Sequence, residues 1–341
     1  MTVWKLLKKI TPGFVKDRYR VYRLCCHSGF PVPVAREMSK ETGIPYWTLL
    51  FDISKSAFFG LVSPYEYRMY RFYEKNRRAR DRFLTEYRTP YLVSAFNRGD
   101  LSLMRDKQLF NNYFSDFVGR QWLYAPDATD QQIEEFLDSQ KQIIVKPVDG
   151  QGGTGIHKLL RSEVTDVKVF CESARKDCLL LEEVVEQHPA LRAINPASVN
   201  TMRIHTVIDR AGVPHILSAG LRMGSGQAVT DNLSVSGLFA QIDLDTGVLF
   251  TLAVDANLQT HVKHSISGVI LPGFQIPHWE AARAMVFEAA KMTPQIRWVG
   301  WDIAVTEKGP LLIEGNATFP APRTMQMATQ IGMSHVLRSY L

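Results

Sequence analysis

Apolar residues recur at helical spacing through the first third of the chain. We predict that residues 1–104 are mainly helical, with proline-containing breaks between the helices. Ser63 comes directly before Pro64, which is typical of a helix start, because Ser caps backbone N–H groups and Pro lacks one. The helices predicted in this part are Val34–Thr42, Pro64–Glu86 and Tyr91–Asn97.

From Trp122 onward, short apolar runs alternate with amphipathic segments, which indicates strands interleaved with helices. The predicted strands are Ile143–Val148, Leu179–Val185, Arg203–Asp209, His215–Met223, Ala240–Asp243 and Val248–Ala253. The predicted helices are Lys107–Phe117 with Asp106 as N-cap, Thr129–Lys141 with Asp127 or Thr129 as N-cap, Val164–Ala174, His278–Met292 and Met325–Tyr340. Helices packed on mostly antiparallel sheets indicate an α+β fold.

A predicted hairpin, Trp298–Asn316, carries three oxygen-bearing side chains. Two apolar runs flank its turn, Thr306–Gly309. Because side chains alternate along a strand, Glu314 and Asn316 point to one face, and Asp302 lies across from Glu314 to within one residue. Oxygen ligands of this kind suit Mg²⁺ that also holds substrate phosphates. The alternative is a surface hairpin with scattered acids.

A glycine-rich loop follows the predicted strand that ends at Lys146. Four glycines fall within Asp149–Gly155, so backbone N–H groups can approach an anion without a Cβ in the way. The loop matches neither the Walker A nor the Rossmann pattern. A glycine-rich turn is usually only a turn, but the lysine beside this one favours phosphate binding.

The strand predicted at Leu179–Val185 ends in two adjacent carboxylates, Glu182 and Glu183. Neighbouring side chains on a strand face opposite ways, so one of the two is expected to face a cleft. The alternative is a strand that leaves the core and becomes solvated.

Composition describes an ordinary globular chain of 341 residues with 45% apolar and 22% charged residues. No run of about 18 apolar residues occurs, so we expect no transmembrane helix, and the N-terminus lacks the pattern of a signal peptide. The four cysteines show no metal-ligand spacing, which fits a cytoplasmic location.

Basic residues, which give a net charge of +6, are densest at Lys5–Arg23 and Lys75–Arg82. Solvated helix faces explain both stretches most simply, and we expect no nucleic-acid partner. The first stretch adds an apolar series at helix-like steps with lysines between, so a weak peripheral membrane contact is the alternative there. That series is Trp4, Leu7, Ile10 and Phe14.

The order of these features resembles the ATP-grasp superfamily, and more narrowly its sugar-transfer-associated members. The resemblance covers roughly Arg105 to the C-terminus and rests on the segments Glu182–Pro189, Asn195–Ile204, Asp231-Asn232, Gly300–Asp302 and Ile313–Ala317. It implies an ATP-grasp fold in which the nucleotide lies between two α+β subdomains, 105–190 and 191–341, behind a helical N-terminal region, 1–104.

The resemblance also implies roles for particular residues. Catalytic roles fall to Arg203 and Lys146, and ligation of one or two Mg²⁺ to Asp302, Glu314 and Asn316. ATP binding falls to Lys107, Lys146, Gly150, Gly152, Gly153, Thr154, Gly155, Glu182, Glu183, Val185, and Glu186 or His188 for the ribose. Substrate binding falls to Asn200, Arg222, His261 and Lys263.

The implied reaction joins a small-molecule carboxylate to an amine through an acyl phosphate, with release of ADP and phosphate. A sugar acid, an amino acid or a related metabolite is the expected substrate. A kinase on the same scaffold and a non-catalytic nucleotide-binding subunit are the alternatives. Two departures, Ser236-Gly237 and His261-Val262 in place of Gly-Gly and His-Pro, fall where the acceptor is expected.

Overall fold

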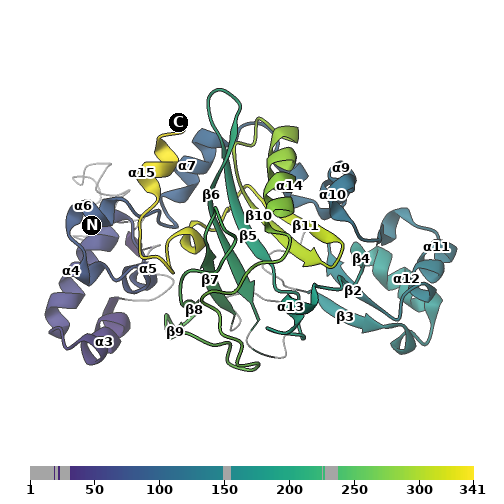
Figure 1. The fold of residues 1–341 in the computed structure, drawn as a ribbon, viewed down its shortest axis with the longest axis horizontal. Helices are drawn as coiled ribbons and strands as arrows, with labels where there is room; N and C mark the ends of the chain where they lie inside the picture. Colours follow the sequence, from purple (N-terminus) through teal and green to yellow (C-terminus); the bar gives the residue numbers. More distant parts are fainter. Residues whose placement is uncertain (1–18, 20–21, 24–30, 149–154, 225, 227–236) are drawn as a thin grey trace, which may run out of the picture. The chain divides into compact units, whose positions relative to one another are not determined.

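The computed structural model describes residues 19, 22–23, 31–148, 155–224, 226 and 237–341. The chain forms two compact units (Figure 1). Unit 1 comprises Met1–Leu92 and Thr329–Ser339, and unit 2 comprises Val93–Ala328 and Tyr340–Leu341. The boundary falls inside helix α7 (Thr89–Phe96). In the part of the chain described, none of the helices combines the length and apolar character that a bilayer crossing requires.

Unit 1 is helical around an aromatic core, as the first third of the sequence predicts. Tyr70, Phe72 and Phe83 pack ring against ring, with centroids 4.7 to 5.9 Å apart. The helices that the structure bounds within its described residues are α3 (Pro31–Thr42), α4 (Tyr46–Gly60), α5 (Pro64–Met69), η1 (Phe72–Glu74), α6 (Arg77–Asp81) and α15 (Ser334–Arg338).

Two long helices predicted from the sequence are wrong. Ser63 does cap α5, but the predicted helix Pro64–Glu86 ends at Tyr70 because Arg71 has a φ of +48°, which a right-handed helix cannot contain. The predicted helix Met325–Tyr340 is interrupted in the same way by Gln330, with a φ of +59°. Only the 3₁₀ turn η5 (Pro322–Met325) and α15 form there.

Unit 2 contains two antiparallel sheets. The four-stranded sheet has the order β1 (Trp122–Tyr124), β4 (Leu179–Glu183), β2 (Gln142–Pro147), β3 (His157–Leu160). The seven-stranded sheet has the order β11 (Gly309–Asn316), β10 (Trp298–Thr306), β5 (Met202–Ile208), β6 (Pro214–Met223), β7 (Leu238–Ile242), β8 (Ala253–Asp255), β9 (Thr260–His261). The α+β prediction is confirmed; the division at residues 104 and 190 stays a prediction.

Helices and turns of unit 2 surround these sheets (Figure 1). Besides η5, those in the described residues are α8 (Ser102–Arg105), α9 (Lys107–Tyr113), α10 (Ser115–Val118), η2 (Ala125–Asp127), α11 (Asp130–Asp138), η3 (Arg161–Glu163), α12 (Val167–Lys176), α13 (Pro189–Arg192) and α14 (Trp279–Met292). Asp106 and Thr129 cap α9 and α11 as predicted. The predicted helix Lys107–Phe117 is divided at Phe114. In the predicted strand Val248–Ala253, Val248 and Leu249 form isolated bridges, and only Ala253 belongs to a strand, β8.

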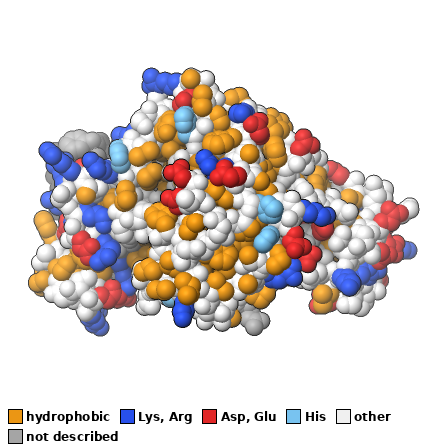
Figure 2. All heavy atoms as spheres, viewed as in Figure 1, with side chains coloured by type: hydrophobic (Ala, Val, Ile, Leu, Met, Phe, Trp, Pro, Cys, Tyr) orange, Lys and Arg blue, Asp and Glu red, His pale blue; other side chains and the backbone are white. Residues whose placement is uncertain are grey.

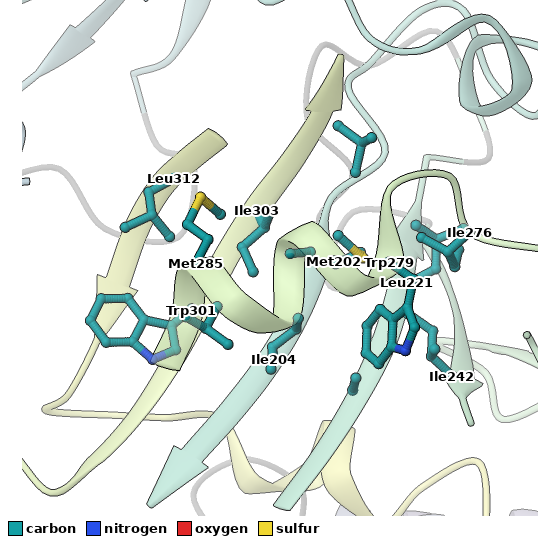
Figure 3. Close-up of a cluster of buried hydrophobic side chains, with 14 of the residues drawn as sticks. Met202, Ile204, Leu221, Ile242, Ile276, Trp279, Met285, Trp301, Ile303 and Leu312 are labelled. Carbon is teal, nitrogen blue, oxygen red and sulfur yellow. The ribbon is translucent and has the colours of Figure 1, made fainter. Parts of the chain in front are cut away.

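The main core lies on one face of the seven-stranded sheet, beneath α14. Figure 3 shows Met202 and Ile204 of β5 among apolar side chains of the neighbouring strands and of α14. Because strand side chains alternate, Arg203 and His205 must point to the opposite face. Burying one face of β5 in this core therefore fixes the direction of the polar residues described next.

Candidate functional site

The β10–β11 hairpin has the register that the sequence predicts. Asp302 lies opposite Glu314, and Gly300 lies opposite Asn316, with a bulge after Asp302. The amide of Asn316 donates a hydrogen bond to Glu314 Oε1 at 3.1 Å. The three predicted metal ligands therefore lie together on one face of the sheet.

Two arginines from neighbouring strands hold Asp302. Arg203 on β5 stands directly across from it and donates through both Nε and Nη2, the latter 2.9 Å from Oδ2. Arg222 Nη1 on β6 lies 2.9 Å from the same oxygen. Burial alone would raise the pKa of Asp302, but the two guanidinium charges outweigh it and lower this pKa to about 2. Asp302 is therefore ionised at neutral pH.

The pKa of Glu314 is shifted in the opposite direction to that of Asp302. Burial, and then the charge of Asp302 directly across the hairpin, raise the pKa of its carboxyl. A bound cation would relieve this repulsion, and oxygen donors of this kind are those that Mg²⁺ prefers. The residues therefore fit Mg²⁺. Among the residues that the structure describes, no group of three or more His, Cys, Asp or Glu is placed to hold a metal ion, so this site of two carboxylates would depend on Asn316 as its third ligand.

A second buried charge cluster lies on the four-stranded sheet. Lys146 Nζ at the end of β2 is 2.7 Å from Glu182 Oε2, and Arg120 Nη2 is 2.9 Å from Oε1 of the same glutamate. Asn111 donates to that oxygen at 3.1 Å. Burial would raise the pKa of Glu182, but the two cations hold it well below its usual range. The cluster thus contains two cations and one anion.

Lys146 also connects the two clusters. Burial lowers the pKa of its ammonium, and the charges of Glu182 and, more weakly, Glu314 oppose that shift. Glu314 belongs to the seven-stranded sheet, so the predicted phosphate-binding lysine and a predicted metal ligand act on each other electrostatically.

Arg120 is a site residue that the sequence did not reveal. It lies in the loop before β1, carries no motif, and is buried. Its Nη1 donates to the carbonyl of Leu312 on β11 at 2.7 Å, while its Nη2 contacts Glu182 on β4. One guanidinium therefore joins the two sheets, and only the folded arrangement brings these partners together.

Lys107 lies beside the start of the glycine-rich loop. Its Nζ donates to the carbonyls of Pro147 and Val148, at 3.2 and 3.1 Å. Gly155 at the end of the loop has a φ of +78°, and a Cβ there would lie 2.9 Å from the ring of Pro147, so glycine is required on both counts. The predicted phosphate-binding residues Gly150, Gly152, Gly153 and Thr154 lie outside the described residues.

The predicted hinge runs on from β4. The carboxylate of Glu183 turns away from Glu182 and accepts the N–H of Gln121 at 2.9 Å, so the two acids face opposite ways as predicted. Glu186 is exposed and pairs with Arg192. His188 Nδ1 accepts the N–H of Ala190 at the start of α13. Val185 is half-buried in the segment between β4 and α13.

The predicted substrate residues do not all gather at Asp302. Arg222 contacts it directly, whereas Asn200 is fully buried and donates to Gln187 and to backbone carbonyls. Lys263 is exposed. His261 Nε2 pairs with Asp255 at 3.0 Å.

The contact between His261 and Asp255 is part of a hairpin arrangement that occurs twice in unit 2. Asp255 also accepts two N–H groups of the turn between β8 and β9. Asp209 and His215 repeat the same arrangement between β5 and β6, at 2.8 Å. These contacts therefore stabilise hairpins, and a substrate role for His261 stays a prediction.

The segment after β11 closes over the polar face of the sheet. Arg203 Nη1 donates to the carbonyl of Pro320 at 3.4 Å, and His205 Nε2 lies 3.1 Å from the hydroxyl of Thr324. A Cβ on Gly300 would lie 2.9 Å from that same carbonyl of Pro320. Burial, and then Arg203, lower the pKa of His205 to about 3, so His205 is neutral and supports the segment.

Two protein families match parts of the chain. Residues 157–340 match a family described as sugar-transfer associated ATP-grasp. Residues 107–192 match a family described as the ATP-grasp domain of prokaryotic glutathione synthetase. No curated protein matches the chain significantly.

Solved structures that match include the ATP-grasp ligase PsnB complexed with minimal precursor, Mg and ADP, at 14% identity over 65% of this chain and 53% of that one, with a TM-score of 0.40. D-alanyl-alanine synthetase A from Vibrio cholerae matches at 13% identity over 70% of this chain and 60% of that one, with a TM-score of 0.39. The chain spans about half the length of the PsnB structure.

Proposed function

The chain belongs to the sugar-transfer associated ATP-grasp family, and from this premise we propose that it is an ATP-dependent carboxylate–amine ligase. The proposed reaction passes through an acyl phosphate and releases ADP and phosphate. Its proposed substrates are an amine and a small-molecule acid, such as a sugar acid or an amino acid. ATP with one or two Mg²⁺ would be the cofactors, and dependence on ATP is consistent with a cytoplasmic location.

The observation that carries this proposal is a buried cationic cluster that Arg120 joins to β11, the strand that carries one member of a carboxylate pair. On one side, Lys146 and Arg120 leave an excess of buried positive charge around Glu182. On the other side, Asp302 and Glu314 form a carboxylate pair. A cationic cluster beside a pair of metal-binding carboxylates is the arrangement that a nucleotide triphosphate with its cation requires.

The chemistry explains why such a site is needed. A carboxylate does not react directly with an amine, because oxide would have to leave, so its oxygen must first receive a phosphoryl group. Phosphoryl transfer depends mainly on charge neutralisation and alignment. Lys107 and Lys146 would bind phosphate oxygens, and Arg203 would hold the transferred group. When bound to Asp302, Glu314 and Asn316, Mg²⁺ would neutralise further phosphate charge.

The remaining predicted roles belong to the same proposal. Arg222 would hold the substrate carboxylate, because its guanidinium already lies at Asp302. The backbone from Glu183 to Val185 would contact the adenine, and Glu186 or His188 the ribose. Closure of the glycine-rich loop would exclude water, which would otherwise hydrolyse the acyl phosphate.

The test is ADP release from Mg·ATP with a panel of uronic acids and amino acids against a panel of amines. Hydroxylamine should trap the acyl phosphate as a hydroxamate. Glu314→Gln should lower ADP formation about 100-fold or more and still fold, because the site already favours the uncharged carboxyl. Asp302→Asn should have at least the same effect on activity.

Asp209→Asn is the matched control, since it makes the same chemical change at a hairpin turn of unit 2 and should leave ADP formation unchanged. Release of AMP would contradict the proposal. A stable phosphoester with no hydroxamate would identify a kinase instead. Nucleotide binding without any substrate-dependent turnover would identify a non-catalytic subunit.

A further inference from the structure

Helix α4 of unit 1 is apolar on two opposite faces. One face is buried inside unit 1 and carries a row of apolar residues at every fourth position: Leu49, Ile53 and Ala57. The opposite face carries a second such row: Trp47, Phe51, Lys55 and Phe59. Trp47 is 75% exposed, Phe51 73% and Phe59 65%, so the second row presents large aromatic rings to solvent. Exposed aromatic rows of this kind are uncommon on soluble surfaces and mark contact surfaces.

Charge is distributed unequally between the two units. Unit 1 contains 19 lysines and arginines and eight aspartates and glutamates, a net charge of +11. Unit 2 contains 21 lysines and arginines and 26 aspartates and glutamates, a net charge of −5. Figure 2 shows many Lys and Arg side chains on the part of the surface that unit 1 forms. The aromatic row of α4 therefore belongs to the strongly basic unit.

The basic residues of unit 1 include some on helices near the row. Lys55 stands within the row itself and is exposed. α3, which packs beside α4, exposes Arg36 and Lys40 one helical turn apart. The N-terminal sequence has the same character, because Trp4, Leu7, Ile10 and Phe14 alternate with lysines. Bulky apolar side chains mixed with lysine and arginine are typical of segments that lie in a membrane interface.

We propose that unit 1 docks the protein reversibly on an anionic lipid bilayer. Trp47, Phe51 and Phe59 would enter the boundary between headgroups and acyl chains, where aromatic side chains are favoured. Lys55 would extend its ammonium to the lipid phosphates while its methylenes stay among the apolar groups. The net charge of +11 would attract the negatively charged surface. The proposal is independent of the ligase reaction.

Other occupants fit these observations less well. A second copy placed row against row would bring two units of charge +11 together. Single-stranded nucleic acid binds along a basic groove with stacking platforms, whereas the row lies on the convex surface of a helix. The N-terminal pattern also includes Leu7 and Ile10, whose aliphatic side chains cannot stack on nucleic-acid bases but can pack among acyl chains.

The test is flotation of the full-length protein with lipid vesicles. The wild type should float with vesicles of one part phosphatidylglycerol to about two parts phosphatidylcholine and much less with pure phosphatidylcholine. Trp47→Ser combined with Phe51→Ser should lower the partition coefficient about tenfold or more, since two interfacial rings are lost. Lys55→Glu should lower the partition coefficient on anionic vesicles but not on neutral ones. Trp47→Phe keeps an aromatic ring and should leave the partition coefficient unchanged.

Phe250→Ser is the matched control, because Phe250 is 54% exposed but belongs to unit 2, and it should float like the wild type. Circular dichroism of each variant verifies that it is folded. Equal flotation with neutral and anionic vesicles, or unchanged flotation of the Trp47–Phe51 double variant, would overturn the proposal. So would a dimer that this double variant dissociates, or single-stranded RNA binding that depends on the same two residues.

Discussion

At the scale of single residues, the site is controlled by an imbalance of buried charge. Lys146 and Arg120 share one carboxylate, Glu182, and all three side chains are at most 7% exposed. A buried ion pair contributes little to stability by itself, because desolvation offsets the Coulombic attraction. The excess cation fits the proposed function, in which the phosphates of a bound nucleotide would supply the missing negative charge. Arg120 then holds the cluster against β11 through Leu312.

Charge counting predicts which substitution in this cluster damages the protein most. Glu182→Gln leaves two buried cations facing each other without a counter-ion, and we expect it to lower the free energy of unfolding by about 3 to 5 kcal/mol. Lys146→Met leaves the neutral pair of Arg120 and Glu182, and we expect a loss of only about 1 kcal/mol. Urea unfolding of both variants measures the difference. The argument fails if Lys146→Met is the more destabilising.

The residues that sequence could identify are those that local pattern constrains. Asp302 and Glu314 lie on adjacent strands of a hairpin, so alternation and a short turn suffice to place them face to face. Arg120 and Asn111 contact Glu182 across 62 and 71 residues of sequence, and no local pattern carries that information. The contact of Arg203 with Asp302 spans 99 residues, and the family resemblance alone pointed to Arg203.

At the scale of secondary-structure elements, one helix start contains a buried acid. Ser63 and Glu66 form a capping box at α5, in which Glu66 accepts the N–H of Ser63 and, at 2.7 Å, that of Glu86. Burial raises the pKa of Glu66 from 4.5 to about 7. The folded protein therefore binds this proton more tightly than the unfolded chain does, and the advantage is lost as pH rises through about 7.

Glu66→Gln should remove this pH dependence. A glutamine amide cannot ionise, so the stability of the variant should not fall between about pH 4.5 and 7 as that of the wild type does. Its single oxygen can accept only one of the two backbone N–H groups that Glu66 holds through separate oxygens, which adds a pH-independent loss of about 1 to 3 kcal/mol. Measured against the wild type, the stability of the variant should therefore rise by on the order of 3 kcal/mol from below pH 4.5 to above pH 7. Chemical denaturation at several pH values measures it. Glu74→Gln changes an exposed glutamate of the same unit and should follow the wild type; a Glu66→Gln variant that does the same would refute the assignment.

Element boundaries show where sequence reasoning stops. Apolar residues recur at helical spacing through Pro64–Glu86. Arg71 nevertheless adopts a left-handed conformation, and Phe72 directly after it is buried in the aromatic core. Such a turn is stabilised by tertiary packing and has no glycine or proline to mark it. By contrast, Ser63, Asp106 and Thr129 cap their helices as predicted, because capping depends on residues within one turn.

At the scale of the whole molecule, the two units differ in composition and in expected role. Unit 2 contains both sheets and every described residue of the candidate nucleotide site, whereas unit 1 is helical and strongly basic. The motif order along unit 2 was enough to predict the ATP-grasp fold, since the family match now covers residues 157–340. Hydrophobic periodicity predicted that unit 1 is helical, but it could not show that α4 exposes a second apolar face, because exposure depends on what packs against a helix.

This division leads to a prediction for hydrogen exchange. If the nucleotide binds in unit 2, Mg·AMPPNP should slow amide exchange in β2 and β11, which carry Lys146 and Glu314, and should leave α4 unchanged. At about 100 times the dissociation constant, binding should add about 2.7 kcal/mol to the stability of unit 2. Lys146→Met, which should fold, is the control and should lose the protection. Slowed exchange of equal size in α4 would show that the nucleotide also acts on unit 1, contrary to a site confined to the two sheets.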